Sequence, residues 1–189
     1  IILASGRAEC CDKGLRSLKY HRPEGRLVIS VGPVDAGETT AAASALGRSA
    51  DDAANWFNWP TTRSPCQDQD GALKDLEDAV TTAGPEQILA VVIEPVYQKN
   101  GLAVPTEFWE KLASRCTKYD IPLVVIEHST GGFRSGQGMW RSDTLPVQPD
   151  AVWFFAGGQL SMAYVNDRYY VSKKLTLIST WDGDELALN

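Results

Sequence analysis

The stretch PLVVIEHSTGG, residues 122–132, joins a run of aliphatic residues to a cluster of polar residues and glycines. The run from Leu123 to Ile126 is typical of a strand that is buried on both faces of a parallel sheet. The first polar residues after it, Glu127 and His128, then lie at the carboxyl end of the strand. Because open α/β sheets bind their ligands at that end of their strands, the stretch predicts an α/β fold with a candidate site after Ile126.

The same alternation of apolar runs and helix-like segments extends over the chain in both directions. Strands rich in Val, Ile and Leu between amphipathic helices indicate a parallel sheet that is covered by helices on both faces. The expected strands are 1–5, 26–31, 88–97, 122–128, 150–158 and 160–165, and the expected helices are 11–21, 72–83 and 105–119.

No repeat, low-complexity tract or linker divides the 189 residues, so we expect one domain over residues 1–189. The chain begins at Ile1 with strand-like residues and no signal-peptide pattern, which favours a segment of a longer chain. Residues 32–71 read as irregular, which is long for a loop inside a compact domain and suggests a functional excursion.

The composition is that of an ordinary globular protein, with 43% hydrophobic and 22% charged residues. A formal net charge of −6 argues against general nucleic-acid binding, which needs a basic face. No apolar run reaches the ~18–20 residues that span a bilayer, so no membrane span is expected. The four cysteines lack the spacing of a zinc site, and we expect reduced thiols, no metal and a cytoplasmic location.

Four strand ends carry residues that could take part in chemistry. Gly6 precedes a helix start, where backbone amides can bind an anion, although a structural turn explains it equally well. Glu94 ends a buried strand and either orients a loop or reacts. Glu127 and His128 could form an acid–base pair, but neighbours on a strand point to opposite faces and cannot both face one substrate. The fourth end, residues 154–159, has two glycines and no ionisable group.

Taken in order, these strand ends make the chain resemble the large cofactor-binding domain of class III, fold type I aminotransferases, above all the 4-aminobutyrate and lysine aminotransferase branch. The resemblance extends from ILASGRAE (2–9) to STWDGDEL (179–186). It is strongest over residues 89–136, where the family's VEP and DEVQTGxGRTG patterns read IEP and IEHSTGGFRSG. The resemblance implies a three-layer α/β sandwich with a mostly parallel seven-stranded sheet, and an activity that depends on pyridoxal phosphate.

Most residues with which the family handles this cofactor are replaced. Pyridoxal phosphate chemistry needs a lysine for the Schiff base and an acidic group at the pyridine nitrogen. By the resemblance, the lysine position falls on Ala156 or Gly157, and the aspartate that begins DEVQTG has become Ile126. The aromatic–histidine pair that stacks on the cofactor ring has become Asp35 and Ala36.

A few cofactor contacts of the family are kept. The resemblance marks Gly6, Glu127 and Thr180 as vestigial cofactor-binding residues, while the SGAE pattern of the phosphate loop reads GRAE here. Lys173 and Lys174 follow a polar, helix- or loop-like stretch, which makes them poor substitutes for the missing lysine. We therefore expect no catalytic residue, and we expect pyridoxal phosphate to have been lost.

This pattern of loss predicts a pseudo-aminotransferase domain, which acts without catalysis as a structural or protein-interaction module in a larger protein or assembly. Its partner would be another protein, a flanking domain of the same chain or a second copy, because the family's active sites form across a dimer interface. The aromatic stretch WFNWP, residues 56–60, either seals an edge of the core or anchors such an interface.

Two other functions remain open. One is an active pyridoxal-phosphate-dependent aminotransferase of the 4-aminobutyrate or lysine type, whose cofactor residues have a different register from the one assigned above. The other is a module that binds a different small ligand in the old cofactor cleft, with polar contacts from Arg7, Asp35, Glu127 and His128.

Overall fold

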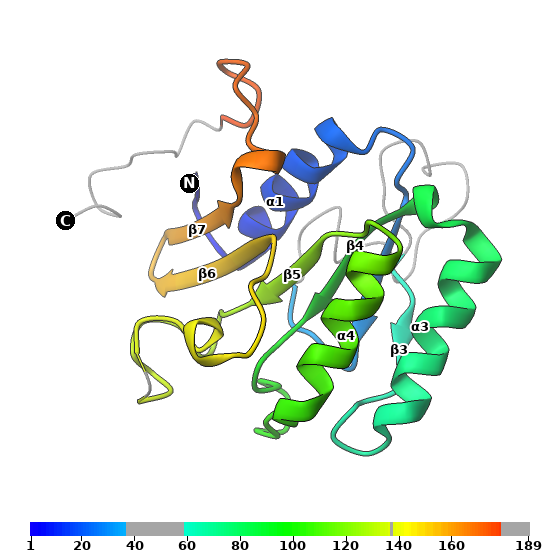
Figure 1. Cartoon of the computed structure of the whole chain (residues 1–189). Helices are drawn as coiled ribbons and strands as arrows, with labels where there is room; N and C mark the ends of the chain where they lie inside the picture. The colour runs from blue at the N-terminus through cyan, green and yellow to red at the C-terminus, as the bar shows by residue number, and fades with distance from the viewer. Residues whose placement is uncertain (37–58, 137, 179–189) are drawn as a thin grey trace.

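The structure is a computed structural model that describes residues 1–36, 59–136 and 138–178. These residues form one seven-stranded sheet with helices on both of its faces, as Figure 1 shows. The α/β fold and the mostly parallel seven-stranded sheet expected from the sequence are thereby confirmed.

The strands are β1 (Ile2–Ala4), β2 (Leu27–Val31), β3 (Thr61–Thr62), β4 (Ile88–Ile93), β5 (Leu123–Ile126), β6 (Ala151–Gly157) and β7 (Leu160–Val165). Their order in the sheet is β1-β7-β6-β5-β4-β2-β3. Strands β6, β5, β4, β2 and β3 are parallel, whereas β7 is antiparallel to both β6 and β1. All residues of the central strands β4 and β5 are buried, which explains their uninterrupted aliphatic sequences.

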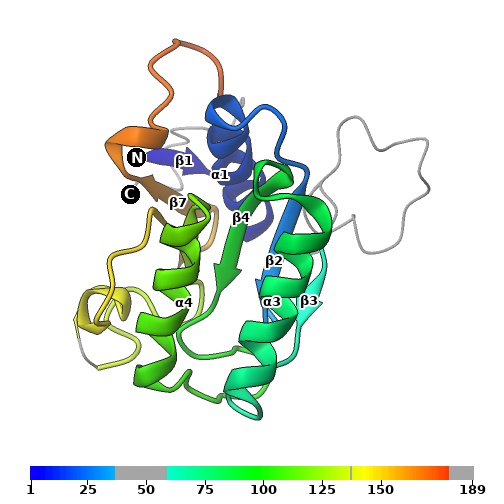
Figure 2. The same ribbon diagram turned by 45° about the vertical axis from the view of Figure 1, so that its right-hand side comes forward.

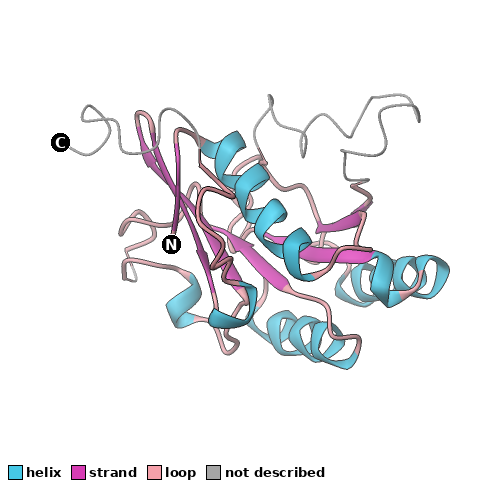
Figure 3. Ribbon diagram, turned by 90° about the horizontal axis from the view of Figure 1, so that it is seen from above, coloured by secondary structure: helices cyan, strands magenta, loops and turns pink. Residues whose placement is uncertain are grey.

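The helices are α1 (Arg7–His21), α3 (Gln69–Ala83) and α4 (Thr106–Lys118), with short 3-10 helices η2 (Pro85–Gln87), η3 (Ser142–Thr144) and η4 (Asp167–Tyr169). Helices α3 and α4 lie side by side on one face of the sheet (Figure 2). The view from above shows helices on both sides of the strands, and α1 covers the face opposite α3 and α4 (Figure 3).

The face of the sheet under α1 carries one of the two cores. Leu15 and Leu18 of α1 are fully buried there together with Ile126 and Trp153. Gly14 faces Trp153 so closely that a Cβ atom at this position would lie 2.2 Å from the indole Nε1. Glycine in this helix therefore makes room for the largest side chain of β6.

The second core lies between the sheet and the helix pair α3–α4. Phe108, Leu112 and Cys116, which recur at four-residue spacing along α4, are buried in it and form one apolar stripe. Trp109, beside this stripe, is fully buried as well.

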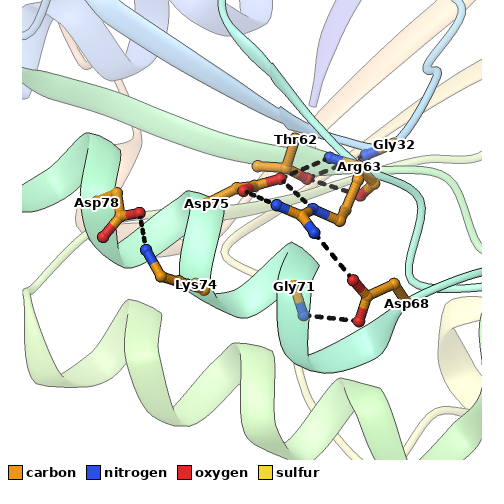
Figure 4. Close-up of polar contacts among 8 residues, drawn as sticks. All are labelled: Gly32, Thr62, Arg63, Asp68, Gly71, Lys74, Asp75 and Asp78. Atoms are coloured by element: carbon orange, nitrogen blue, oxygen red, sulfur yellow. Dashed lines mark hydrogen bonds and ion pairs between the residues drawn. The ribbon is translucent and has the colours of Figure 1, made fainter.

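Arg63, directly after β3, connects the edge of the sheet to the start of α3 (Figure 4). Asp68 is the N-cap of α3 and accepts a hydrogen bond of 2.9 Å from the amide of Gly71. The Arg63 guanidinium donates to Asp68 at 3.0 Å and to both carboxylate oxygens of Asp75, at 2.9 and 3.0 Å. These exposed contacts orient the helix start, although ion pairs at the surface are screened by water and contribute little to stability.

The stretch from 32 to 71 contains more regular structure than its sequence indicates. Strand β3 lies within it and α3 begins at Gln69, while residues 37–58 lie outside the described residues. Trp56 is among the latter. Trp59 is buried against the α1-side core, and its indole N–H donates to the hydroxyl of Ser30, so the described part of the aromatic stretch seals the core.

Within the described ranges, no helix has the length and apolar character needed to cross a membrane. The same ranges contain no group of three His, Cys, Asp or Glu side chains that could hold a metal ion. All four cysteines are free thiols. Burial raises the pKa of both Cys10 and Cys116 to about 12, which keeps these thiols unreactive at neutral pH.

Candidate functional site

A cavity of about 780 Å³ opens beside the start of α1. It lies between this helix start and the loops that follow β2 and β4, where the carboxyl ends of the parallel strands meet. The residues that line it are Ser5, Gly6, Arg7, Ala8, Glu9, Pro33, Val34, Asp35, Gln98 and Lys99. We refer to this cavity as the cleft.

The start of α1 forms one wall of the cleft. Gly6 is the N-cap residue, and its carbonyl accepts the first helical hydrogen bond from the amide of Cys10 at 2.9 Å. The amide and hydroxyl of Ser5 both donate to the carboxylate of Glu9 at 2.6 Å. A helix N-terminus attracts anions. Here the carboxylate of Glu9, in the first turn of α1, already interacts with the positive end of the helix dipole.

Arg7 reaches across the cleft and holds its walls together. Its guanidinium forms an ion pair with Asp35 and lies 3.4 Å from the side-chain oxygen of Gln98. The same group stands 5.5 Å from the centre of the Phe155 ring, within the range of a cation–π contact. The sequence suggested Arg7 and Asp35 as ligand contacts, and the structure shows them in contact with each other.

Glu94, at the end of β4, acts as a tie between two loops. Its carboxylate accepts hydrogen bonds from the amide of Asp35 and, at 2.7 Å, from the amide of Gln98. Burial raises the pKa of this carboxyl group, and the two amides counteract the rise. Of the two roles that the sequence left open for Glu94, the orientation of loops accounts for its contacts.

His128 lies close to Arg7 and Asp35 but is almost entirely enclosed, with 5% of its surface exposed. Neither ring nitrogen makes a hydrogen bond of good geometry with a described residue, although the backbone of Asp35 lies close enough to act on the ring. Burial lowers the pKa of His128 to about 4, a shift that the nearby Asp35 opposes and Arg7 reinforces. The imidazole is therefore neutral at physiological pH and keeps unused hydrogen-bonding capacity.

Glu127 does not line the cleft. Its fully buried carboxylate accepts hydrogen bonds from the Thr130 hydroxyl at 2.5 Å and from the amides of Arg141 and Ser142, at 3.1 and 2.5 Å. It thereby fixes the loop after β5 to the start of η3. The strand expected to extend to residue 128 ends at Ile126, so Glu127 and His128 lie in the turn after β5. In this turn His128, and not Glu127, approaches Arg7 and Asp35.

The positions assigned to the family's lysine and aspartate contain no ionisable group. Ile126 is fully buried in the α1-side core, and Ala156 lies near the end of β6. Lys173 and Lys174 are exposed beyond η4 and are not among the residues that line the cleft. Thr180 lies outside the described residues.

Sequence reasoning missed Lys99, an exposed lysine that lines the cleft. It follows β4, whereas the resemblance puts the family's lysine at Ala156 or Gly157, the last two residues of β6. The one feature of the sequence that could have pointed to Lys99 is its position five residues after Glu94, which ends a predicted strand.

A seven-stranded sheet with this topology and a cleft at the carboxyl ends of its strands defines a fold of the aminotransferase type. Compared with known protein families, residues 44–189 match the family described as Aminotransferase class-III. The chain therefore belongs to the class III aminotransferase family.

Among curated relatives, the taurine–pyruvate aminotransferase of Bilophila wadsworthia is 33% identical over 85 residues, which are 44% of this chain and 18% of the relative. The "Probable gamma-aminobutyrate transaminase 4" of Oryza sativa subsp. japonica is 38% identical over 79 residues, 41% of this chain and 16% of the relative. The matched segments thus span less than a fifth of these relatives.

Solved structures show the same fold. A transaminase from the marine bacterium Virgibacillus superposes with a TM-score of 0.80 at 23% identity, over 96% of this chain and 45% of that one. The (S)-enantioselective omega-transaminase of Thermomicrobium roseum gives a TM-score of 0.77 at 21% identity, over 96% of this chain and 46% of that one. The chain therefore spans about half the length of these transaminases.

The described residues do not fit a covalently bound pyridoxal phosphate. At the phosphate end, the α1 start with Gly6 remains, but Glu9 is bound to Ser5 beside it. At the ring end, Ile126 offers no charge to a pyridine nitrogen and Ala156 offers no amine. Of the two acidic residues that line the cleft, Glu9 is bound to Ser5 and Asp35 is paired with Arg7.

Proposed function

We propose that this chain is a pseudo-aminotransferase domain, which has kept the fold of its family and serves as a non-catalytic structural or protein-interaction module in a larger protein or assembly. The observation that supports the proposal most is the pair Ile126 and Ala156 at the positions of the aspartate and the lysine. The residues marked as vestigial, Gly6, Glu127 and Thr180, belong to this proposal, and of these Glu127 now has a structural role.

The magnitude of the loss supports the absence of catalysis. A hydrogen bond to a charged group contributes about 1.5–3 kcal/mol, and the carboxylate that keeps a pyridine nitrogen protonated also stabilises the transition state. Without the lysine, the cofactor would have no covalent anchor. The two losses affect separate functions, so one compensating side chain would not restore both.

The sheet and its cores, in contrast, are intact. Both faces of the sheet carry closely packed buried residues, and the loops at its carboxyl edge are tied by Glu94 and Glu127. A rigid domain without its chemistry is suited to docking against a partner protein, a flanking domain or a second copy. The four free thiols, of which three are buried, are in keeping with the cytoplasmic location that we propose with this function.

A direct assay tests the proposal. The purified chain would be incubated with pyridoxal phosphate, pyruvate and either taurine or 4-aminobutyrate, the donors suggested by the relatives' names, and alanine formation would be followed. We expect no alanine above that of a protein-free control, while a full-length class III aminotransferase serves as the positive control. Turnover by this chain would contradict the proposal and favour an active enzyme that uses another lysine, for which Lys99 is the candidate in the cleft.

A second candidate function is the binding of a different small ligand in the cleft. The volume of about 780 Å³ is sufficient for a small molecule. The neutral imidazole of His128, close to the lining residues Arg7 and Asp35, makes no hydrogen bond of good geometry with a described residue. Thermal unfolding in the presence of candidate ligands would reveal such binding as a concentration-dependent rise in the midpoint. A rise that the His128→Gln variant does not show would favour this function.

A further inference from the structure

A second cavity, of about 470 Å³, lies between the loop after β4 and the loop after β5. Its walls include Gln98 and Gly101 from the first loop and Ser129, Arg134 and Ser135 from the second. Arg141, just before η3, closes one side. Apart from Gln98, it shares no lining residue with the cleft beside α1.

The charged side chains that line this cavity are all positive. Arg134 and Arg141 are its two charged lining residues, and no carboxylate belongs to the lining within the described ranges. The nearest acidic side chain in the same loop, Glu127, has both oxygens engaged by Thr130, Arg141 and Ser142 through hydrogen bonds. These bonds to Glu127 come from a hydroxyl and two backbone amides and not from a guanidinium, so the lining itself presents cationic donors to an anion.

The guanidinium of Arg134 is held in place before any ligand arrives. It donates to the carbonyl oxygens of Gly131 and Phe155 at 3.0 Å and of Ala156 at 3.1 Å, and it stands 5.7 Å from the centre of the Phe154 ring. A charge fixed in this way does not have to lose side-chain freedom when it binds an anion.

Arg141 is anchored through its backbone but has donors to spare. Its amide binds Glu127 at 3.1 Å, and one guanidinium nitrogen donates to the hydroxyl of Thr144 at 2.7 Å. A guanidinium has five N–H donors in a planar fork, a geometry that matches the oxygens of a carboxylate or a phosphate. Ser135 adds a buried hydroxyl oxygen that has no hydrogen-bond partner among the described residues.

We propose that this cavity binds a small oxyanion, carried by a phosphate- or carboxylate-bearing molecule. Arg134 supplies a fixed positive charge, and Arg141 donates hydrogen bonds to the anion from its remaining N–H groups. The hydroxyl of Ser135 donates a further hydrogen bond to the anion. The site goes beyond the proposed function, because it uses none of the residues of the cleft wall at α1 and needs no pyridoxal phosphate.

Calorimetric titration of the whole chain with inorganic phosphate, and separately with succinate, tests the site at constant ionic strength held with sodium chloride. We expect saturable binding of at least one anion at one site per chain. Binding of phosphate alone identifies a phosphate-bearing ligand, and binding of succinate alone identifies a carboxylate-bearing one. Failure of both anions to bind would overturn the proposal.

Three variants locate the bound anion. Arg141→Gln removes a charged hydrogen-bond donor and should weaken binding roughly tenfold to a hundredfold, whereas Arg141→Lys keeps the charge and should weaken it less. Ser135→Ala should weaken binding without altering the charge, which keeps the test valid if Arg141→Gln fails to fold. Lys99→Gln, in the cleft beside α1, is the matched control and should leave affinity unchanged. If Lys99→Gln abolished binding and Arg141→Gln did not, the anion would lie in the cleft and the proposal would be wrong.

Discussion

Ile126 on β5 is paired in register with Trp153 on β6, and neither side chain is exposed to solvent. An aspartate at position 126 would place a carboxylate in an apolar core under α1. We expect Ile126→Asp to destabilise the chain by about 1–3 kcal/mol, because an unpaired polar group is costly to bury. Urea unfolding followed by tryptophan fluorescence measures the effect.

Ile126→Val is the matched control for this prediction. It removes one methylene without adding charge and should cost only about 0.5–1.5 kcal/mol. If Ile126→Asp left the unfolding midpoint unchanged, the space beside Ile126 would have to be open and hydrated, and the account of a core filled at the former cofactor position would be wrong.

A second prediction concerns the contact between Gly14 and Trp153. In an exposed helix, Gly→Ala stabilises by roughly 0.5–1 kcal/mol, but a Cβ at position 14 would lie 2.2 Å from the indole Nε1. We expect Gly14→Ala to destabilise by about 1–3 kcal/mol, the usual cost of overpacking. Trp153→Phe replaces the indole with a smaller ring and removes Nε1. The double variant should therefore lose less stability than the sum of the two single variants. Strict additivity would show that the helix shifts freely away from the strand.

A third prediction concerns pH. His128 has a pKa of about 4 in the folded chain, against an ordinary value of 6.5, so the unfolded chain binds the extra proton between these values. Stability should therefore fall as the pH drops from 6.5 to about 4, by up to about 3 kcal/mol, and this contribution should stay constant below pH 4.

Comparison with the His128→Gln variant isolates the part of the pH dependence of stability that His128 contributes. Other groups titrate in the same range, including Glu94, whose raised pKa acts with the opposite sign. The difference between the two pH profiles cancels these common contributions. Parallel profiles for the original chain and the variant would mean that His128 is hydrated and titrates normally.

Apolar runs were sufficient to predict the central strands and the two-sided cover of helices. The sequence did not show which polar groups pair, because those contacts join distant segments. Arg7 meets Asp35 across 28 positions of the chain, and Glu127 meets Ser142 across 15. Such pairs depend on how loops fold back, and loop geometry has no periodic signal.

The second cavity was missed for the same reason. Arg134 and Arg141 are seven positions apart in a stretch without periodicity, and only the fold of the loop after β5 brings them to one cavity. The aromatic stretch around Trp59 was ambiguous between core and interface. The buried indole and its hydrogen bond to Ser30 favour the core for this residue.

The central claim is that the chain cannot hold pyridoxal phosphate covalently, and the most direct test is the intact mass after borohydride reduction. The chain would be mixed with an equal amount of pyridoxal phosphate, reduced with sodium borohydride, dialysed and examined by mass spectrometry, with Lys99→Arg treated in parallel. Because Ala156 stands at the lysine position, we predict that both proteins keep their unmodified masses. A stoichiometric adduct on a single lysine of the original chain would contradict the account, and its disappearance in Lys99→Arg would identify the lysine that had replaced the missing one.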